Sequence, residues 1–183
     1  DGSIEWAKKF GGSGIDSGAA IAVDTKGCIY TACRTISKDG DAKGSDGSVD
    51  IFVVKYSPSG EQLWSQLLKG SKSEEVEDMY AGSDGCVIVG RYASSDGVFG
   101  INRGSYDAYM AHIKADGTLN WVRTYGGLKG ERFYSVIPTS FGYAAVGITY
   151  SDNRDFGAIG NKGGSDAFIM SIDKKGNVLD VAS

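Results

Sequence analysis

A short motif recurs along the chain at nearly constant spacing, and this repeat limits the possible folds more than any other feature. In the first three copies a glycine stands four residues before a tryptophan, as in Gly2 to Trp6. The fourth copy ends in Asp180 instead. The copies begin at residues 2, 60, 117 and 176, so the spacings are 58, 57 and 59 residues. A fixed period of this size indicates a repeated supersecondary unit.

The repeat divides the chain into units without leaving a linker between them. We therefore treat residues 1–183 as a single repeat domain. Its units lie at about residues 2–59, 60–116 and 117–175, with a partial unit at 176–183.

Each unit contains four short segments with the composition of β-strands. The segments are β-branched, aromatic or alternating, and Gly, Ser and Asp bound them. The expected strands are 19–24, 28–34, 51–57, 61–68, 76–82, 86–92, 108–114, 118–125, 133–139, 143–149, 167–173 and 177–182, preceded by one at 3–10. We predict an all-β fold of three four-stranded antiparallel repeats of about 58 residues, plus an extra N-terminal strand.

The connections between these strands alternate between tight and long. Tight, glycine-containing turns follow the first and third strands of each unit, and long connections follow the second and fourth. The long connections are 36–49, 94–106 and 150–165, and 11–17, 69–75 and 126–132. Alternate connections of an up-and-down sheet lie at the same end, so we expect every long loop at one end, where binding residues concentrate.

Four-stranded antiparallel units repeated at this period are typical of β-propeller blades. The small residues Ala19, Ala20 and Ala22, and Pro138 in the equivalent strand, fit an innermost edge strand. Propellers have about four to eight blades, so three cannot close a ring. A homodimer of six blades or additional repeats would complete it, and a threefold β-trefoil or β-prism is the alternative.

The motifs resemble the bacterial SBBP-type β-propeller repeat over essentially the whole chain. The likeness rests on the Trp-x-x-x-aromatic-Gly-Gly pattern at 6–12 and 121–127, and on the segments 16–24 and 50–55. The second unit departs from it at 68–70 and 77–80. The resemblance implies a propeller in a secreted or cell-surface protein and implies no single activity.

Composition and charge exclude several classes of function. The net charge is −4, which gives no overall attraction for nucleic acid. No apolar run approaches the ~18 residues of a membrane span. The three cysteines, Cys28, Cys33 and Cys86, are too few for a disulfide scaffold, and we expect free thiols.

The sequence gives little support to catalysis. The single histidine, His112, falls near the tight-turn end of its strand, where we expect a surface or rim residue away from the long loops. One histidine and three scattered cysteines do not suit zinc. Paired-carboxylate glycoside chemistry remains an alternative, with candidates in or near the long loops. These are Glu74, Glu75, Glu77, Asp78, Glu131 and Asp155.

One acidic segment has partial calcium-loop spacing. Asp39, Asp41 and Asp50 stand at relative positions 1, 3 and 12, with Gly44 at position 6. Lys43 occupies a ligand position, however, and strands flank the segment. Asp50 also heads a strand in a position that recurs in each unit, which favours a structural role. Calcium is therefore the only cofactor that we consider.

Aromatic and polar residues that do not recur between units are the best binding candidates. The recurring tryptophans are expected to pack the outer strands instead. The candidates combine stacking surfaces with guanidinium and amide groups that recognise hydroxyls. They are Arg91, Tyr92, Phe99, Asn102, Arg103, Tyr106, Tyr150, Asn153, Arg154, Phe156 and Asn161.

These residues predict a non-catalytic binding module that uses the long-loop end, and the family resemblance implies that it is extracellular. The expected ligand is a polysaccharide or oligosaccharide, without nucleic acid or membrane insertion. Two alternatives remain open: a structural or adhesive protein-interaction module, and a glycoside hydrolase or lyase using loop carboxylates.

Overall fold

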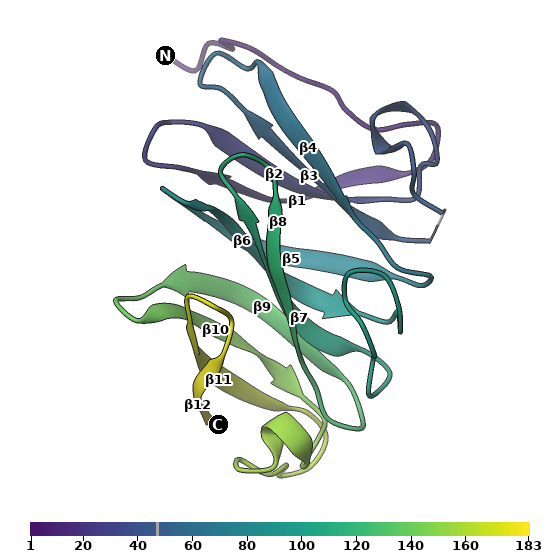
Figure 1. The fold of residues 1–183 in the computed structure, drawn as a ribbon, viewed down its shortest axis with the longest axis vertical. Helices are drawn as coiled ribbons and strands as arrows, with labels where there is room; N and C mark the ends of the chain where they lie inside the picture. Colours follow the sequence, from purple (N-terminus) through teal and green to yellow (C-terminus); the bar gives the residue numbers. More distant parts are fainter. Residues whose placement is uncertain (47) are drawn as a thin grey trace.

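The computed structural model describes residues 1–46 and 48–183, and its β-strands form three separate four-stranded antiparallel sheets (Figure 1). The first sheet contains β1 (Asp16–Val23), β2 (Ile29–Thr35), β3 (Asp50–Tyr56) and β4 (Gln62–Leu68). The second contains β5 (Glu74–Gly82), β6 (Gly85–Tyr92), β7 (Asp107–Lys114) and β8 (Leu119–Tyr125). The third contains β9 (Glu131–Pro138), β10 (Gly142–Thr149), β11 (Asp166–Asp173) and β12 (Val178–Ala182). Short 3₁₀ turns lie at η1 (Gly40–Ala42) and η2 (Arg154–Phe156).

Strand order in every sheet follows chain order, which confirms the three up-and-down repeats. Local turn chemistry explains this order. Gly27, Gly60, Gly117 and Gly176 have φ between 78° and 91°, a conformation that favours glycine. Each donates its N–H to the carbonyl three residues earlier and closes a tight turn. Consecutive strands joined so closely must pair as antiparallel neighbours.

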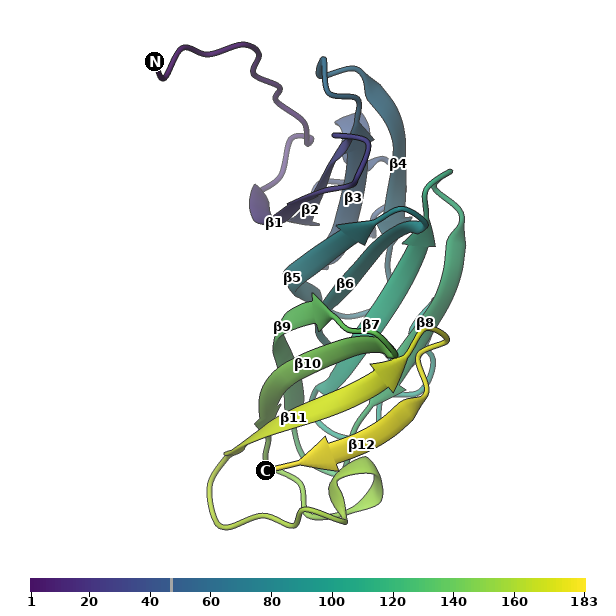
Figure 2. The same cartoon turned by 90° about the vertical axis from the view of Figure 1, so that its left-hand side faces the viewer.

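The sheets stack face to face in chain order, with the second sheet between the first and the third (Figure 2). One apolar core lies between the first and second sheets and includes Tyr30, Val53 and Tyr109. Another lies between the second and third and includes Met110 and Phe168. The first strands β1, β5 and β9 lie along one side of the stack (Figure 2). A threefold trefoil or prism would bring the first and third sheets together, whereas the second sheet separates them here.

The recurring tryptophans pack against the turn glycine that begins the next unit. The Trp64 indole N–H donates to the Ala115 carbonyl at 3.0 Å, and Trp6 donates equivalently to Pro58 at 3.1 Å. A Cβ added to Gly117 would lie 2.9 Å from the Trp64 ring, so the contact needs glycine. The expected packing role of these tryptophans is confirmed.

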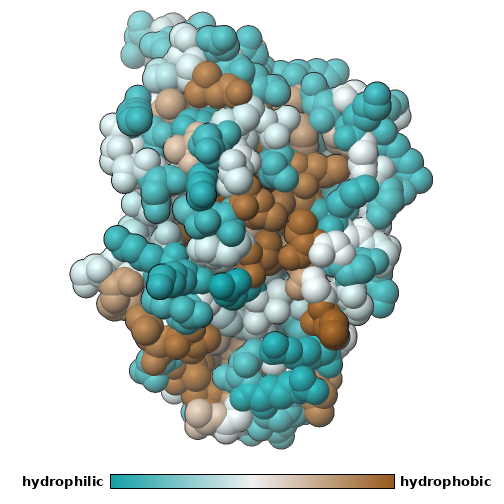
Figure 3. Space-filling model, viewed as in Figure 1, coloured by the Kyte–Doolittle hydropathy of each residue, from teal (hydrophilic) through white to brown (hydrophobic). Residues whose placement is uncertain are grey.

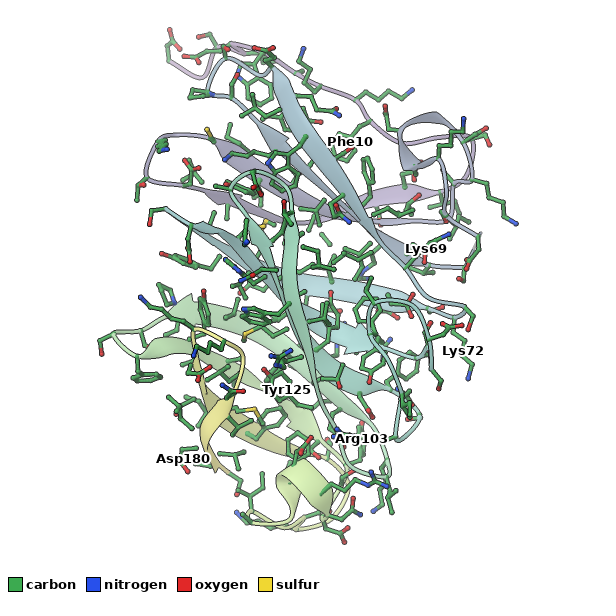
Figure 4. All side chains as sticks on the ribbon, in the orientation of Figure 1. Phe10, Lys69, Lys72, Arg103, Tyr125 and Asp180 are labelled. Atoms are coloured by element: carbon green, nitrogen blue, oxygen red, sulfur yellow. The ribbon has the colours of Figure 1, made fainter. Side chains whose placement is uncertain are left out.

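Two predictions need correction. Residues 3–10 form no β-strand in the structure, because no neighbouring strand among the described residues hydrogen-bonds to them. They lie across the outer face of the first sheet, where Phe10 contacts Phe52 and Tyr56 (Figure 4). His112 lies near the tight-turn end as expected, but it is buried against Trp121.

The cysteines are free, as expected, with Cys33 and Cys86 buried and Cys28 partly buried. Burial raises the pKa of the Cys86 thiol to about 12 and that of Cys33 to about 11. Both thiols are therefore protonated and unreactive at neutral pH.

Candidate functional site

A cavity of about 470 Å³ opens at the long-loop end, where the second and third sheets meet. Three tyrosines and three cationic side chains contribute to its wall. The lining residues are Arg91, Ser105, Tyr106, Lys129, Gly130, Glu131, Arg132, Tyr134, Ile148 and Tyr150. An aromatic pocket with a few polar groups is the usual form of a small-ligand site.

Backbone hydrogen bonds between three loops build one wall of the cavity. The Ser105 N–H donates to Lys129 O at 2.8 Å, and the Glu131 N–H donates to Tyr106 O at 2.8 Å. The Tyr150 N–H donates to Gly130 O at 3.0 Å. These bonds join the loop before β7, the β8–β9 loop and the end of β10. The cavity is therefore held in shape by the main chain.

Arginines and glutamates form a network beneath the cavity. Arg91 Nη2 lies 2.8 Å from Glu75 Oε1, and Arg34 Nη2 lies 2.9 Å from Glu77 Oε1. Arg132 also binds Glu77. Glu77 of β5 therefore links Arg34 of the first sheet to Arg132 of the third. Three arginines and two glutamates leave one positive charge. Glu131, which lines the cavity and has no ion-pair partner among the described residues, balances this charge.

Each cavity arginine also lies over a tyrosine ring. The Arg91 guanidinium carbon is 4.4 Å from the Tyr106 ring centre, and that of Arg132 is 4.9 Å from the Tyr134 ring centre. Such cation–π contacts hold the rings in fixed orientations. Tyr134 and Tyr150 are each 44% exposed, so both rings offer surface to a ligand.

Lys129 supplies a further charge at the cavity. Its side chain is exposed, and within the described residues it has no carboxylate partner at ion-pair distance. The Nε atoms of Arg91 and Arg132 are likewise buried without a hydrogen-bond partner in the part of the chain that the structure describes. Lys129 is therefore the cationic group at the cavity that remains available to an anionic ligand, while the lining carboxylate Glu131 is held by hydrogen bonds from Gly127 and Thr149.

A recurring carboxylate anchors the long loops in every unit. It stands at the start of each first strand and accepts a backbone N–H from the glycine four residues earlier. The pairs are Gly12 with Asp16, Gly70 with Glu74, and Gly127 with Glu131, at 2.9, 2.9 and 2.8 Å. Burial raises the pKa of Glu74 to about 7. Glu131 contributes to the cavity wall, and its hydrogen bond from Gly127 gives it the same structural role.

The structure brings three of the predicted binding residues together in the cavity, namely Arg91, Tyr106 and Tyr150. It places three predicted aromatics in the interior instead. Tyr92 stacks on Phe99 with ring centres 5.2 Å apart, and Phe156 meets Phe168 edge-on at 4.8 Å. These three aromatic residues are buried, so they support the loops from beneath and do not face a ligand.

The remaining predicted polar residues bind neighbouring loop segments, apart from Arg154. Asn102 Nδ2 donates to Tyr92 O at 2.9 Å, and Asn161 Nδ2 donates to Gly164 O at 3.2 Å. Arg103 bridges to Asp155 at 2.6 Å and joins loops of the second and third sheets (Figure 4). Asn153 Oδ1 accepts the Leu128 N–H at 3.0 Å. Arg154 is exposed and has φ of 53°.

Sequence reasoning missed Lys129, Arg132 and Tyr134. Tyr134 falls within the predicted strand 133–139, whereas Arg132 is the last residue of the predicted long loop 126–132. The criterion that selected Tyr106, an aromatic that does not recur between units, would also have selected Tyr134. Lys129 gave no comparable signal, because lysines are common in surface loops.

The three aspartates of the suggested calcium loop serve different parts of the structure. Asp39 Oδ1 accepts the Ser13 N–H at 2.7 Å, and Asp41 Oδ2 accepts the Gly11 N–H at 3.0 Å. Asp50 is fully buried and accepts the Ser45 hydroxyl at 2.6 Å. Gly47 of this loop lies outside the described residues. Across the residues that are described, no three potential ligands gather as a metal cluster.

Comparisons with known proteins add no functional assignment. No protein-family model matches the chain, and no curated protein matches it either. No helix in the described ranges is long and apolar enough to cross a membrane. The functional argument therefore rests on the chain's own geometry.

Proposed function

We propose that this chain is a non-catalytic, extracellular carbohydrate-binding module that uses three β-propeller blades as its scaffold. The observation that carries the proposal is the cavity in which Tyr106, Tyr134 and Tyr150 meet cationic side chains. Sugar rings present apolar C–H faces and planar arrays of hydroxyls. Tyrosine rings pack against the former, and guanidinium groups donate hydrogen bonds to the latter.

Charge favours an acidic sugar over a neutral one. Three arginines and the exposed Lys129 exceed the carboxylates Glu75, Glu77 and Glu131 by one positive charge. A carboxylate on the sugar would gain a charge-assisted hydrogen bond from these donors. The ligand class is therefore a polysaccharide that carries uronic acid groups.

The propeller architecture is supported by the way in which the sheets stack. They pack face to face in chain order, and their first strands lie side by side (Figure 2). This is the arrangement of blades around an axis. The secreted or cell-surface setting follows from the resemblance to SBBP-type repeats.

Binding is favoured over glycoside hydrolysis because the nearby carboxylates are engaged. Glu75 and Glu77 are ion-paired with arginines, while Glu131 accepts hydrogen bonds from Gly127 and Thr149. Glycoside hydrolysis needs two carboxyl groups that are free to act as acid and base, and none of these three is free in this way. A protein partner remains the alternative ligand for the same surface.

Affinity electrophoresis in gels that contain polygalacturonate tests the proposal, with dextran as the neutral comparison. We expect polygalacturonate to retard the protein and dextran to retard it less. Tyr134→Ala or Tyr150→Ala should weaken binding about tenfold, because one aromatic contact contributes about 1 kcal/mol or more.

The matched control is Phe141→Ala, which removes an exposed aromatic ring at the tight turn between β9 and β10. It should bind like the unmodified chain. Equal mobility in all gels, or full retardation of both tyrosine variants, would contradict the proposed site. Specific capture of a protein in place of any polysaccharide would favour the interaction-module alternative.

A further inference from the structure

The repeat gives each sheet two faces with matching residues, and the structure shows what each face packs against. In the second sheet, Tyr109 of β7 packs toward the first sheet and the adjacent Met110 packs toward the third. The Asp residues that begin β3, β7 and β11 fix the register between units. Val53, Met110 and Ile169 are therefore equivalent, as are Ala32, Val89 and Val146.

The far face of the third sheet carries this apolar pattern without a sheet to cover it. Val53 and Met110 have no exposed surface, whereas Ile169 is 53% exposed. Likewise Val89 is fully buried, whereas Val146 is 44% exposed. A hollow of about 130 Å³ lies among these side chains. Figure 3 shows apolar surface over the third sheet, at its lower left.

The outer face of the first sheet carries the complementary half of the same interface. Trp6 contacts Gly60 in the same way that Trp64 contacts Gly117. Residues 3–10 therefore lie on the first sheet in the position that β4 takes on the second sheet. Beside Phe10, a groove of about 340 Å³ extends over the inner strands and includes Ile21 and Cys33. This groove is the place that the inner strands of a preceding sheet would fill.

We infer that the far face of the third sheet docks on the outer face of the first sheet in a second copy of this chain. The chain holds both halves of a sheet-to-sheet interface that it already uses twice internally. A head-to-tail contact between identical chains closes into a ring or grows into a fibre. Two copies supply six sheets, which lies within the range of closed propellers. This inference rests on the proposed propeller architecture and not on the sugar site.

A ring of two copies would also give residues 3–10 a strand to pair with. Lys55 of β3 pairs with Trp64, and the equivalent Ser171 of β11 pairs with Asp180 of β12. Residues 3–10 of the second copy, which carry Trp6 in this register, compete with β12 for the place beside β11. The two segments lie at opposite ends of the stack in one chain, as Phe10 and Asp180 show (Figure 4). In the dimer, residues 3–10 take this place and β12 is displaced.

Light scattering coupled to size-exclusion chromatography tests the inference without any ligand. The unmodified chain should elute at twice 19.3 kDa. Ile169→Glu should shift the mass to that of one chain, because a charge would be buried in the interface. Ile169 is exposed in the single chain, so the variant should keep its fold, which circular dichroism verifies. Ile101→Glu, at a 76% exposed loop position, is the matched control and should remain dimeric.

Deleting residues 178–183 tests the exchanged strand. The truncated chain should still form a dimer, since residues 3–10 of the second copy replace β12. Loss of the dimer on this deletion would overturn the strand exchange. A single-chain mass at every concentration, a dimer that survives Ile169→Glu, or masses that grow beyond two chains would overturn the two-copy ring. None of these results bears on polysaccharide binding, so the two proposals fail separately.

Discussion

Buried carboxylates are the residues on which the long-loop end depends most directly. Glu74 is fully buried, accepts the Gly70 N–H at 2.9 Å and is hydrogen-bonded by the Ser94 hydroxyl. Burial raises its pKa to about 7, and burial also raises the pKa of Asp107 to about 6. The loops are therefore anchored by carboxyl groups whose pKa values burial raises above their ordinary range.

Glu74→Gln should reduce the pH dependence of stability. The folded pKa lies above the ordinary value of 4.5, so the folded chain retains a proton that the unfolded chain releases. The free energy of unfolding contributed by Glu74 should fall as pH rises from about 4.5 to 7. Glutamine keeps the hydrogen-bonding shape without titrating, so the melting temperature of the variant should fall less over this range.

Thermal denaturation followed by circular dichroism across this pH range measures the effect. Glu61→Gln, at an exposed turn position, is the control and should follow the unmodified chain. Identical pH profiles for Glu74→Gln and the unmodified chain would show that Glu74 does not titrate in this window.

At the scale of elements, the contact between an outer strand and the next turn defines the stack. Trp64 of β4 packs on Gly117, and Trp121 of β8 packs on Gly176. Both glycines have positive φ, so the same residue closes a hairpin and admits the indole. The repeated motif therefore encodes both a turn within one sheet and a contact between two.

Gly117→Ala should destabilise the fold through both roles. Alanine at φ of 91° costs about 1–2 kcal/mol, and its Cβ would lie 2.9 Å from the Trp64 ring. We expect the free energy of unfolding in urea to fall by at least about 1 kcal/mol. Gly100→Ala is the matched control, because φ is 74° there but no atom lies within 4 Å of the added Cβ. Equal losses in the two variants would leave the tryptophan contact without an energetic role.

Strands and turns were predictable from the sequence because they depend on local patterns. Alternating apolar residues and turn glycines located all twelve strands of the three sheets. Residues 3–10 have the same local pattern but form no strand, since pairing requires a neighbour that composition does not supply. Phe99 and Phe156 were likewise assigned to a binding surface, because an aromatic in a long loop gives no sign of whether it packs inward.

At the scale of the whole molecule, the candidate site is a product of sheet stacking. Arg91 comes from the second sheet and Arg132 from the third, and β5 glutamates bind both. The alternation of loop lengths in the sequence predicts the end of the molecule at which this cavity opens. The sequence did not identify the complete cavity, because the segments that meet there depend on how adjacent sheets pack.

The central claim for function is that the cavity at the long-loop end binds an acidic polysaccharide. An NMR titration of ¹⁵N-labelled protein with an oligogalacturonate tests this claim most directly. The account predicts saturable shifts in backbone amide signals of Tyr106, Lys129, Tyr134 and Tyr150, with little change around Phe141. Shifts confined to the tight-turn end, or no shifts at high oligosaccharide concentration, would contradict it.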